Sequence, residues 1–102
     1  LGDVNPGAKV ISSGNVIILG SLKGTVYAGV TGDSTSFVVA LEMEPMQIRI
    51  GDYIARASDD AKKAKDSKNK KNKPETKIAF VENGNIYIEP LNKEVLNDIH
   101  FN

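Results

Sequence analysis

Short apolar runs alternate with glycine-centred breaks along the chain from Gly2 to Gly51. Valine and isoleucine dominate these runs, and β-branched residues favour strands. The breaks are rich in glycine, proline, asparagine and aspartate, which are typical of sharp turns. The pattern predicts strands and no helix in this part of the chain. The predicted strands lie at residues 8–11, 15–19, 24–28, 36–43 and 46–50.

A second region of alternation follows a long charged interruption. Residues 77–81 and 85–89 alternate with period two on either side of Asn83-Gly84, which predicts a hairpin with a two-residue turn. The interruption at 52–75 is a lysine-rich loop, within which residues 53–66 could form a short helix. The tail at 92–102 is expected to be weakly helical or frayed. The whole of 1–102 is therefore expected to be one domain.

Three corner-and-strand units resemble one another, at residues 7–10, 14–17 and 24–27. Such units can form hairpins, or they can coil so that each side of a prism becomes a parallel sheet. Because only Asn83-Gly84 has the two-residue hairpin form, the sequence favours a short three-sided coil. We expect about 28 residues in one turn, the step from Val10 to Val38. Strand 8–11 would then lie under 36–43 and 85–90, strand 15–19 under 46–50, and strand 24–28 under 77–81.

The strand at 36–43 is apolar on both of its faces. If Val38 and Ala40 point inward, then Phe37, Val39 and Leu41 point to water. Ile11 and Tyr87 would be the outward residues of the strands below and above. A contiguous exposed apolar wall indicates a partner interface, so we predict a homodimer contact made by these five residues. The predicted inward set is Ala8, Val10, Val16, Ile18, Val26, Val38, Ala40, Ile48, Ile50, Ile78, Phe80, Ile86 and Ile88.

Composition narrows the class of protein. The absence of cysteine excludes disulfides and thiolate sites and agrees with a reducing cytoplasm. No apolar run approaches the roughly 18 residues of a spanning helix, and the first residues do not resemble a signal peptide. The chain begins within an expected strand, which suggests a piece of a longer protein. Formal charge is zero, but residues 56–77 hold nine basic and four acidic side chains, or +5.

Residues that could support catalysis or bind a metal lack the partners they would need. Ser34 follows Asp33, but the only histidine is His100, so no base is positioned to activate the hydroxyl. Glu42 and Glu44 share a strand face without a further carboxylate nearby in the sequence. The lysines of the loop, at 62–73, have no aromatic residues among them to stack on bases, which argues against nucleic acid. We therefore expect no catalytic site, no metal site and no cofactor.

A set of short motifs nevertheless occurs in a specific order: Gly2-Asp3-Val4-Asn5-Pro6-Gly7-Ala8, Ser13-Gly14-Asn15-Val16, Gly20, Leu22-Lys23-Gly24, Ala28-Gly29, Gly32-Asp33, Ala40-Leu41-Glu42-Met43-Glu44-Pro45, Ile48-Arg49-Ile50 and Asn85 to Leu91. Together they resemble one family, the C-terminal domain of the septum site-determining protein MinC. The resemblance implies a right-handed parallel β-helix that forms a homodimer and binds the membrane-associated ATPase MinD. It also implies an N-terminal domain, absent from these residues, that prevents FtsZ ring assembly at wrong sites. Such a protein is cytoplasmic, is recruited to the inner face of the membrane by MinD, and meets the membrane only indirectly.

The resemblance also suggests where MinD would bind. In the family an Arg-Ser-Gly-Gln motif shortly before the first of these motifs is tied to MinD binding, and it would fall upstream of Leu1. The candidate MinD-binding residues beside it are Asp3, Asn5, Asn15 and Lys23. The chain departs from the family at Ser13, where aspartate is common, and at Lys23, where arginine is common, so a bidentate contact becomes a point charge.

Two other functions remain open from the residues alone. A β-solenoid could act on or bind a small molecule or a polysaccharide, although an acyltransferase would need a usable histidine and a pectin-active coil many more turns. A nucleic-acid adaptor could use the lysine-rich loop.

Overall fold

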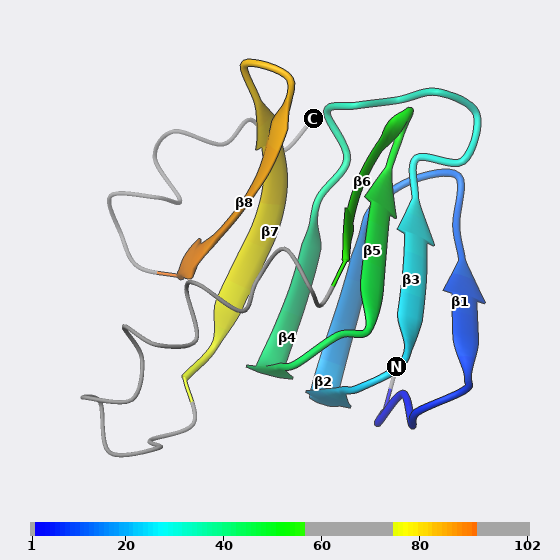
Figure 1. Cartoon of the computed structure of the whole chain (residues 1–102). Helices are drawn as coiled ribbons and strands as arrows, with labels where there is room; N and C mark the ends of the chain where they lie inside the picture. The colour runs from blue at the N-terminus through cyan, green and yellow to red at the C-terminus, as the bar shows by residue number, and fades with distance from the viewer. Residues whose placement is uncertain (1, 57–74, 92–102) are drawn as a thin grey trace.

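The computed structural model describes residues 2–56 and 75–91, and the regular elements in these ranges are all strands (Figure 1). The sequence prediction of an all-β fold is thereby confirmed for the described residues. The strands form two four-stranded sheets, with orders β1-β3-β5-β6 and β2-β4-β7-β8. Their bounds are β1 Lys9–Ile11, β2 Val16–Leu22, β3 Thr25–Ala28, β4 Val38–Met43, β5 Gln47–Ile50, β6 Tyr53–Arg56, β7 Lys77–Glu82 and β8 Asn85–Pro90.

The first five strands pair in parallel. Val16 of β2 lies opposite Val38 of β4, and Val26 of β3 lies opposite Ile48 of β5, so both steps are 22 residues. The expected step of 28 residues was therefore wrong. Val10 lies opposite Val26, and β1 neighbours β3 rather than residues 36–43. The other predicted stackings were wrong for the same reason, since 15–19 does not pair with 46–50, nor 24–28 with 77–81.

The pairing of β2 with β4 is irregular near its middle, and this irregularity separates the strands into two parts. Their register shifts between Ile18 and Ser21, and beyond the shift Leu22 lies opposite Met43. On the other side of Leu22, Val4 forms an isolated parallel bridge, which makes a third, short wall. The corner after this wall requires glycine, because a Cβ atom on Gly24 would lie within 2.5 Å of two backbone carbonyl oxygens.

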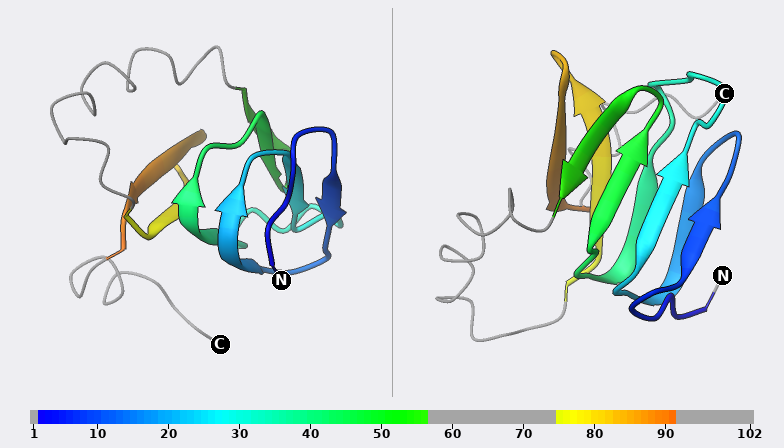
Figure 2. Two further views of the ribbon diagram at one scale, coloured as in Figure 1. Left: turned by 90° about the horizontal axis from the view of Figure 1, so that it is seen from below. Right: turned by 45° about the vertical axis from the view of Figure 1, so that its right-hand side comes forward.

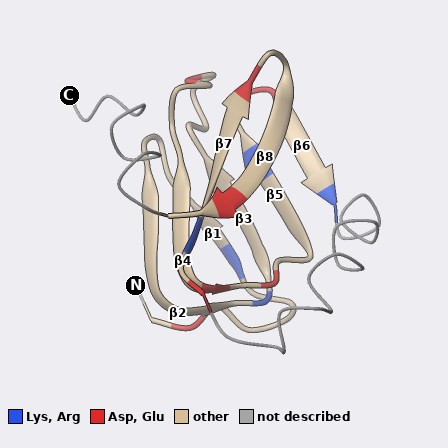
Figure 3. Cartoon of the chain, turned by 90° about the vertical axis from the view of Figure 1, so that its left-hand side faces the viewer, with Lys and Arg blue, Asp and Glu red and all other residues tan. Residues whose placement is uncertain are grey.

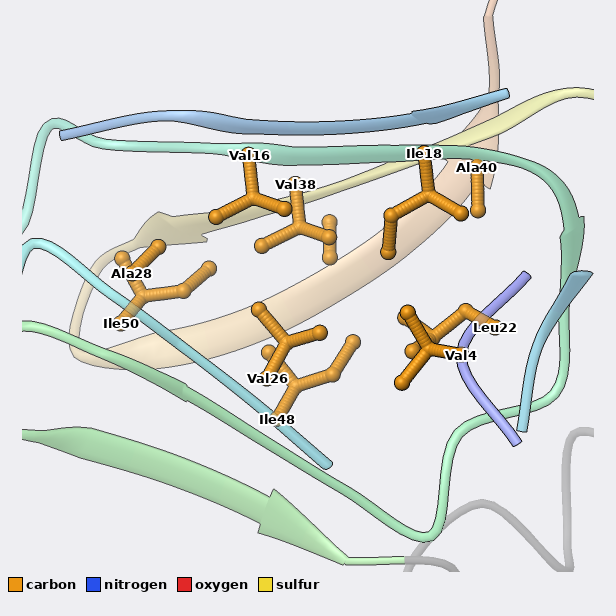
Figure 4. Packing of buried hydrophobic residues seen from close by; sticks show 11 residues of the cluster. Val4, Val16, Ile18, Leu22, Val26, Ala28, Val38, Ala40, Ile48 and Ile50 are labelled. Atoms are coloured by element: carbon orange, nitrogen blue, oxygen red, sulfur yellow. The ribbon is translucent and has the colours of Figure 1, made fainter. Parts of the chain in front are cut away.

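The core lies between the walls (Figure 4). Seven of the residues predicted to point inward are in its buried cluster, from Val16 to Ile50, while Val10, Ile86 and Ile88 are partly buried against it. Ala8 is exposed, so its inward assignment was wrong. The buried cluster consists of Val4, Val16, Ile18, Leu22, Val26, Ala28, Val38, Ala40, Ile48, Ile50 and Ala79.

Strand β7 runs antiparallel to β4 and reverses the predicted facing of its side chains. Val38 lies opposite Ala79, and Val39 lies opposite Ile78. Ala79 therefore faces the core, whereas Ile78 and Phe80 face the outside of the sheet. The predicted inward direction of Ile78 and Phe80 was off by one residue. The pairing of the β7–β8 hairpin with β4, which is distant in sequence, decides which side chains of β7 point to the core. Ile78 is still fully buried, but it lies outside the core cluster.

Two hairpins complete the sheets. Asn83 and Gly84 have φ angles of 53° and 81°, as a two-residue turn of this kind requires, so the predicted β7–β8 hairpin is confirmed. Residues 53–56 form β6, antiparallel to β5, so the possible helix at 53–66 was wrong for this portion. Residues 57–74 and the predicted tail at 92–102 lie outside the described ranges. Strand β6 lies near β8, and both are on the side away from β1 (Figure 2).

Candidate functional site

The segment that resembles a hydrolase motif is a structural turn. The carboxylate of Asp33 accepts hydrogen bonds from the Thr35 hydroxyl at 2.5 Å and from the Thr35 backbone N–H at 2.9 Å. The hydroxyl bond first, and the backbone bond second, lower the pKa of Asp33. His100, the only histidine, lies outside the described residues. The carboxylate therefore stabilises the connection before β4, and no described group activates Ser34.

The acidic residues of the short third wall are also held by local bonds. The Ser21 hydroxyl donates to Glu42 Oε1 at 2.5 Å, and the Ser21 backbone N–H donates to Asp3 Oδ1 at 2.8 Å. Neighbouring turns of the wall are thus tied together by side chains. Within the described ranges, no group of three histidine, cysteine, aspartate or glutamate residues is placed to hold a metal ion.

The outer side of the β2-β4-β7-β8 sheet carries apolar side chains on all four of its strands. Ile17 lies opposite Val39, and Val39 lies opposite Ile78, so one row of side chains crosses three strands. Three of its side chains are well exposed, with Ile17 at 51%, Leu19 at 68% and Leu41 at 44%. The rings of Phe80 and Tyr87 extend the surface, with their centroids 6.0 Å apart. Ile78 itself is fully buried and is not part of the surface. We call Ile17, Leu19, Val39, Leu41, Phe80 and Tyr87 the apolar face.

The structure brings together some of the predicted interface residues and separates others. Val39, Leu41 and Tyr87 lie on the apolar face. Ile11 lies on the other sheet, where it is opposite Tyr27. Phe37 is only 5% exposed, so the expectation that it points to water was wrong. The error at Ile11 comes from the predicted stacking of 8–11 on 36–43, whereas Phe37 precedes β4, so strand alternation does not set its direction.

Sequence reasoning missed Ile17 and Leu19 on this surface. A signal was present, because residues 16–19 read Val-Ile-Ile-Leu and are apolar on both faces of a strand, as 36–43 is. The two runs form the neighbouring strands β2 and β4, so both runs indicate that the outer side of the same sheet is apolar.

Three of the four predicted partner-binding residues meet at one corner. Asp3 and Asn5 flank Val4, whose carbonyl accepts a hydrogen bond from the Lys23 backbone N–H at 2.7 Å. Asp3, Asn5 and Lys23 are all exposed. Asn15 lies in the β1–β2 connection instead, and its Oδ1 accepts a hydrogen bond from the Phe37 backbone N–H at 2.9 Å. The corner cluster is therefore Asp3, Asn5 and Lys23, and Asn15 tightens a separate connection.

Within residues 2–56 and 75–91, no helix has the length and apolar character needed to cross a bilayer.

Known proteins resemble the chain along most of its length. Residues 1–91 match the family described as the septum formation inhibitor MinC, C-terminal domain. Two probable septum site-determining proteins MinC are similar. The one from Agathobacter rectalis is 52% identical over 102 residues, which cover 97% of this chain and 42% of that protein. The one from Lachnospira eligens is 58% identical over 100 residues, which cover 97% and 41%.

A solved structure is also similar to the whole fold. It is the MinC:MinD cell division protein complex of Aquifex aeolicus, with a TM-score of 0.73 and 32% sequence identity. The match covers 99% of this chain and 80% of that one. By contrast, the chain spans about two fifths of the length of the two relatives above.

Proposed function

The chain belongs to the family of MinC C-terminal domains, and from this premise we propose that it is the self-association and MinD-binding module of a cell-division inhibitor. The family resemblance seen in the sequence is confirmed by these matches. The inhibitor as a whole would select the septum site by preventing FtsZ ring assembly elsewhere, through an N-terminal domain beyond these residues. The module itself would catalyse no reaction and need no cofactor.

The proposal includes a right-handed, three-sided parallel β-helix for the part before β6. Its support is the set of parallel pairs, in which Val10 adjoins Val26, Val16 adjoins Val38 and Val26 adjoins Ile48. Right-handed crossovers are the rule for parallel strands in one sheet. The antiparallel β6, β7 and β8 would close the last turn of such a coil, which blunts its open edges.

We place the homodimer contact on the apolar face. The observation that supports it is the exposure of three apolar side chains, Ile17, Leu19 and Leu41, near one another on one sheet. They lie on the side of the sheet that faces away from the core, where polar side chains would be expected in a monomer. A two-fold contact uses the same patch on both copies, so each of these side chains would be buried in both subunits. From the interface predicted by sequence, Val39, Leu41 and Tyr87 remain in the proposal. Ile11 is left out because it lies on the other sheet, and Phe37 because it is buried.

We place the MinD contact at the corner cluster of Asp3, Asn5 and Lys23. These side chains are exposed and polar, and their backbone is held by bonds between neighbouring turns. A rigid backbone lowers the entropy that binding must offset. MinD would then recruit the dimer to the inner face of the membrane.

A solution pull-down with purified, ATP-loaded MinD tests this placement without lipid. Lys23→Glu should weaken capture at least about tenfold, because a like charge replaces a cation within the contact. Lys77→Glu, on the β2-β4-β7-β8 sheet, is the matched charge reversal and should leave capture unchanged. Both variants are made in a chain extended upstream of Leu1 to include the family's Arg-Ser-Gly-Gln motif. Undiminished capture by Lys23→Glu would remove Lys23 from the site, and failure of the extended, otherwise unmodified chain to capture MinD would overturn the proposed partner.

A further inference from the structure

The outer side of the β1-β3-β5-β6 sheet differs in character from the apolar face. Its register places Ile11, Tyr27, Arg49 and Ile54 in one row across four strands, and the neighbouring row holds Lys9, Thr25, Gln47 and Arg56. Their alternating neighbours Val26, Ile48 and Ile50 lie in the core, so these eight side chains point outward. We call the two rows the cationic face.

The cationic face has three cations and no acid among its eight residues. Asp33 and Asp52 lie beyond the strand ends, in the connections before β4 and between β5 and β6. Asp3 and Glu42 lie on the third wall, and Figure 3 shows other acids at the ends of the β7–β8 hairpin, away from the basic positions on β5 and β6. Among the described residues, the three cations of this face are therefore separated from the acids.

The centre of the face holds one positioned cation, and each edge strand adds an exposed isoleucine. The Arg49 guanidinium lies over the Tyr27 ring, 4.2 Å from the ring centroid, in a cation–π contact that holds the charge in place. Ile11 on β1 is 58% exposed and Ile54 on β6 is 44% exposed, so an apolar side chain projects from each edge strand. Arg49 thus lies in a row with an exposed isoleucine at each end, and Lys9 and Arg56 share the edge strands with these isoleucines.

We propose that the cationic face is a contact surface for an anionic lipid bilayer. Lys9, Arg49 and Arg56 would meet lipid phosphates, and Ile11 and Ile54 would enter the headgroup boundary. The choice of lipid over an acidic protein follows from the spread of the charges. They are dispersed over both edges and the centre of one sheet, which suits a fluid surface that offers phosphate everywhere. A protein partner would have to match fixed carboxylates to all three positions.

This contact goes beyond the proposed function, since it needs neither MinD nor the dimer. Each basic group near an anionic membrane changes the partition coefficient about fivefold. Three such groups give weak, reversible binding, which suits a supplement to recruitment by a partner. In a dimer two copies of the face become available, and engagement of both would raise the avidity.

Co-sedimentation of the chain with vesicles tests the proposal directly. Vesicles of phosphatidylcholine mixed with phosphatidylglycerol should pellet the chain, and vesicles of phosphatidylcholine alone should not. Lys9→Gln should lower the partition coefficient about fivefold, and Lys9→Gln with Arg49→Gln about 25-fold. Lys77→Gln removes one charge from the other sheet and is the matched control, with no change expected. Because Lys9 is exposed on an edge strand, Lys9→Gln keeps the test valid even if loss of Arg49 disturbs the fold.

Three outcomes would overturn the proposal. The first is equal pelleting with both kinds of vesicle. The second is an equal effect of Lys9→Gln and Lys77→Gln, which would assign binding to overall charge or to the lysines of residues 62–73. The third is weaker capture of MinD by Lys9→Gln in the lipid-free pull-down with no binding to vesicles, which would make the face a protein-docking surface.

Discussion

Replacing Leu41 by aspartate separates self-association from folding. Leu41 is 44% exposed, so the aspartate remains in water in the monomer and the free energy of unfolding should change by less than about 0.5 kcal/mol. In a two-fold dimer the same position is buried twice. Covering the exposed part of one leucine contributes about 1 kcal/mol, or about 2 kcal/mol for both copies. Desolvating two carboxylates adds at least about 2 kcal/mol more, so dimerisation should weaken about a thousandfold.

Val38→Asp is the matched control on the same strand. Val38 is fully buried in the core cluster, where an unpaired charge costs about 3–5 kcal/mol, a large part of the stability of a small domain. Val38→Asp should therefore unfold the chain. Sedimentation equilibrium at several concentrations, with thermal melts of the same samples, distinguishes the two effects.

The reasoning is refuted if Leu41→Asp still dimerises with unchanged affinity, which would remove the apolar face from the contact. It is refuted differently if Leu41→Asp unfolds the chain while Val38→Asp only dissociates a dimer. Since Val39→Asp is also on the outer side, it should reproduce the effect of Leu41→Asp in direction.

Two further predictions concern the corners of the fold. Gly24→Ala should lower the free energy of unfolding by about 2 kcal/mol or more in urea titrations, because its Cβ would meet the carbonyl oxygens of Asn5 and Ala8 at 2.4 and 2.5 Å. Gly14→Ala has open space around its Cβ and should change little by comparison. Asp33→Asn should destabilise the chain at neutral pH. Folding lowers the pKa of Asp33, so its carboxylate stabilises the folded chain at pH values above its unfolded pKa of about 4. This stabilisation disappears as the pH falls through the lower pKa of the folded state, so the melting temperatures of the Asp33→Asn variant and the unmodified chain should converge in acid.

The strand class and many of the core positions followed from local patterns. Alternation along a strand fixes which residues share a side, so Val16 with Ile18, and Ile48 with Ile50, were assigned inward without knowledge of their neighbours. The hairpin turn at Asn83-Gly84 is equally local, because its positive φ angles select those residue types. Family membership also followed from the sequence, since short motifs in fixed order are specific when taken together.

The pairing of strands was decided only in three dimensions. Whether Val10 adjoins Val26 or Val38 depends on where the chain bends, and the bend inside β2 after Ile18 breaks one apolar run into two walls. The facing of β7 depends on its register with β4, which places Ala79 rather than Ile78 against the core. A one-residue change in that register exchanges the two sides of a strand.

Both surfaces proposed for contact depend on these pairings. The sequence indicated an apolar wall but assigned Ile11 to it and omitted Ile17, because the neighbours of β4 were unknown. The cationic face had no sequence signal, since Lys9, Arg49 and Arg56 are far apart in the chain and meet only where β1, β3, β5 and β6 align. Periodicity is a property of one strand, whereas a surface is a property of several. The sequence therefore determined what each strand presents on its two sides, and the tertiary register determined which of those sides join.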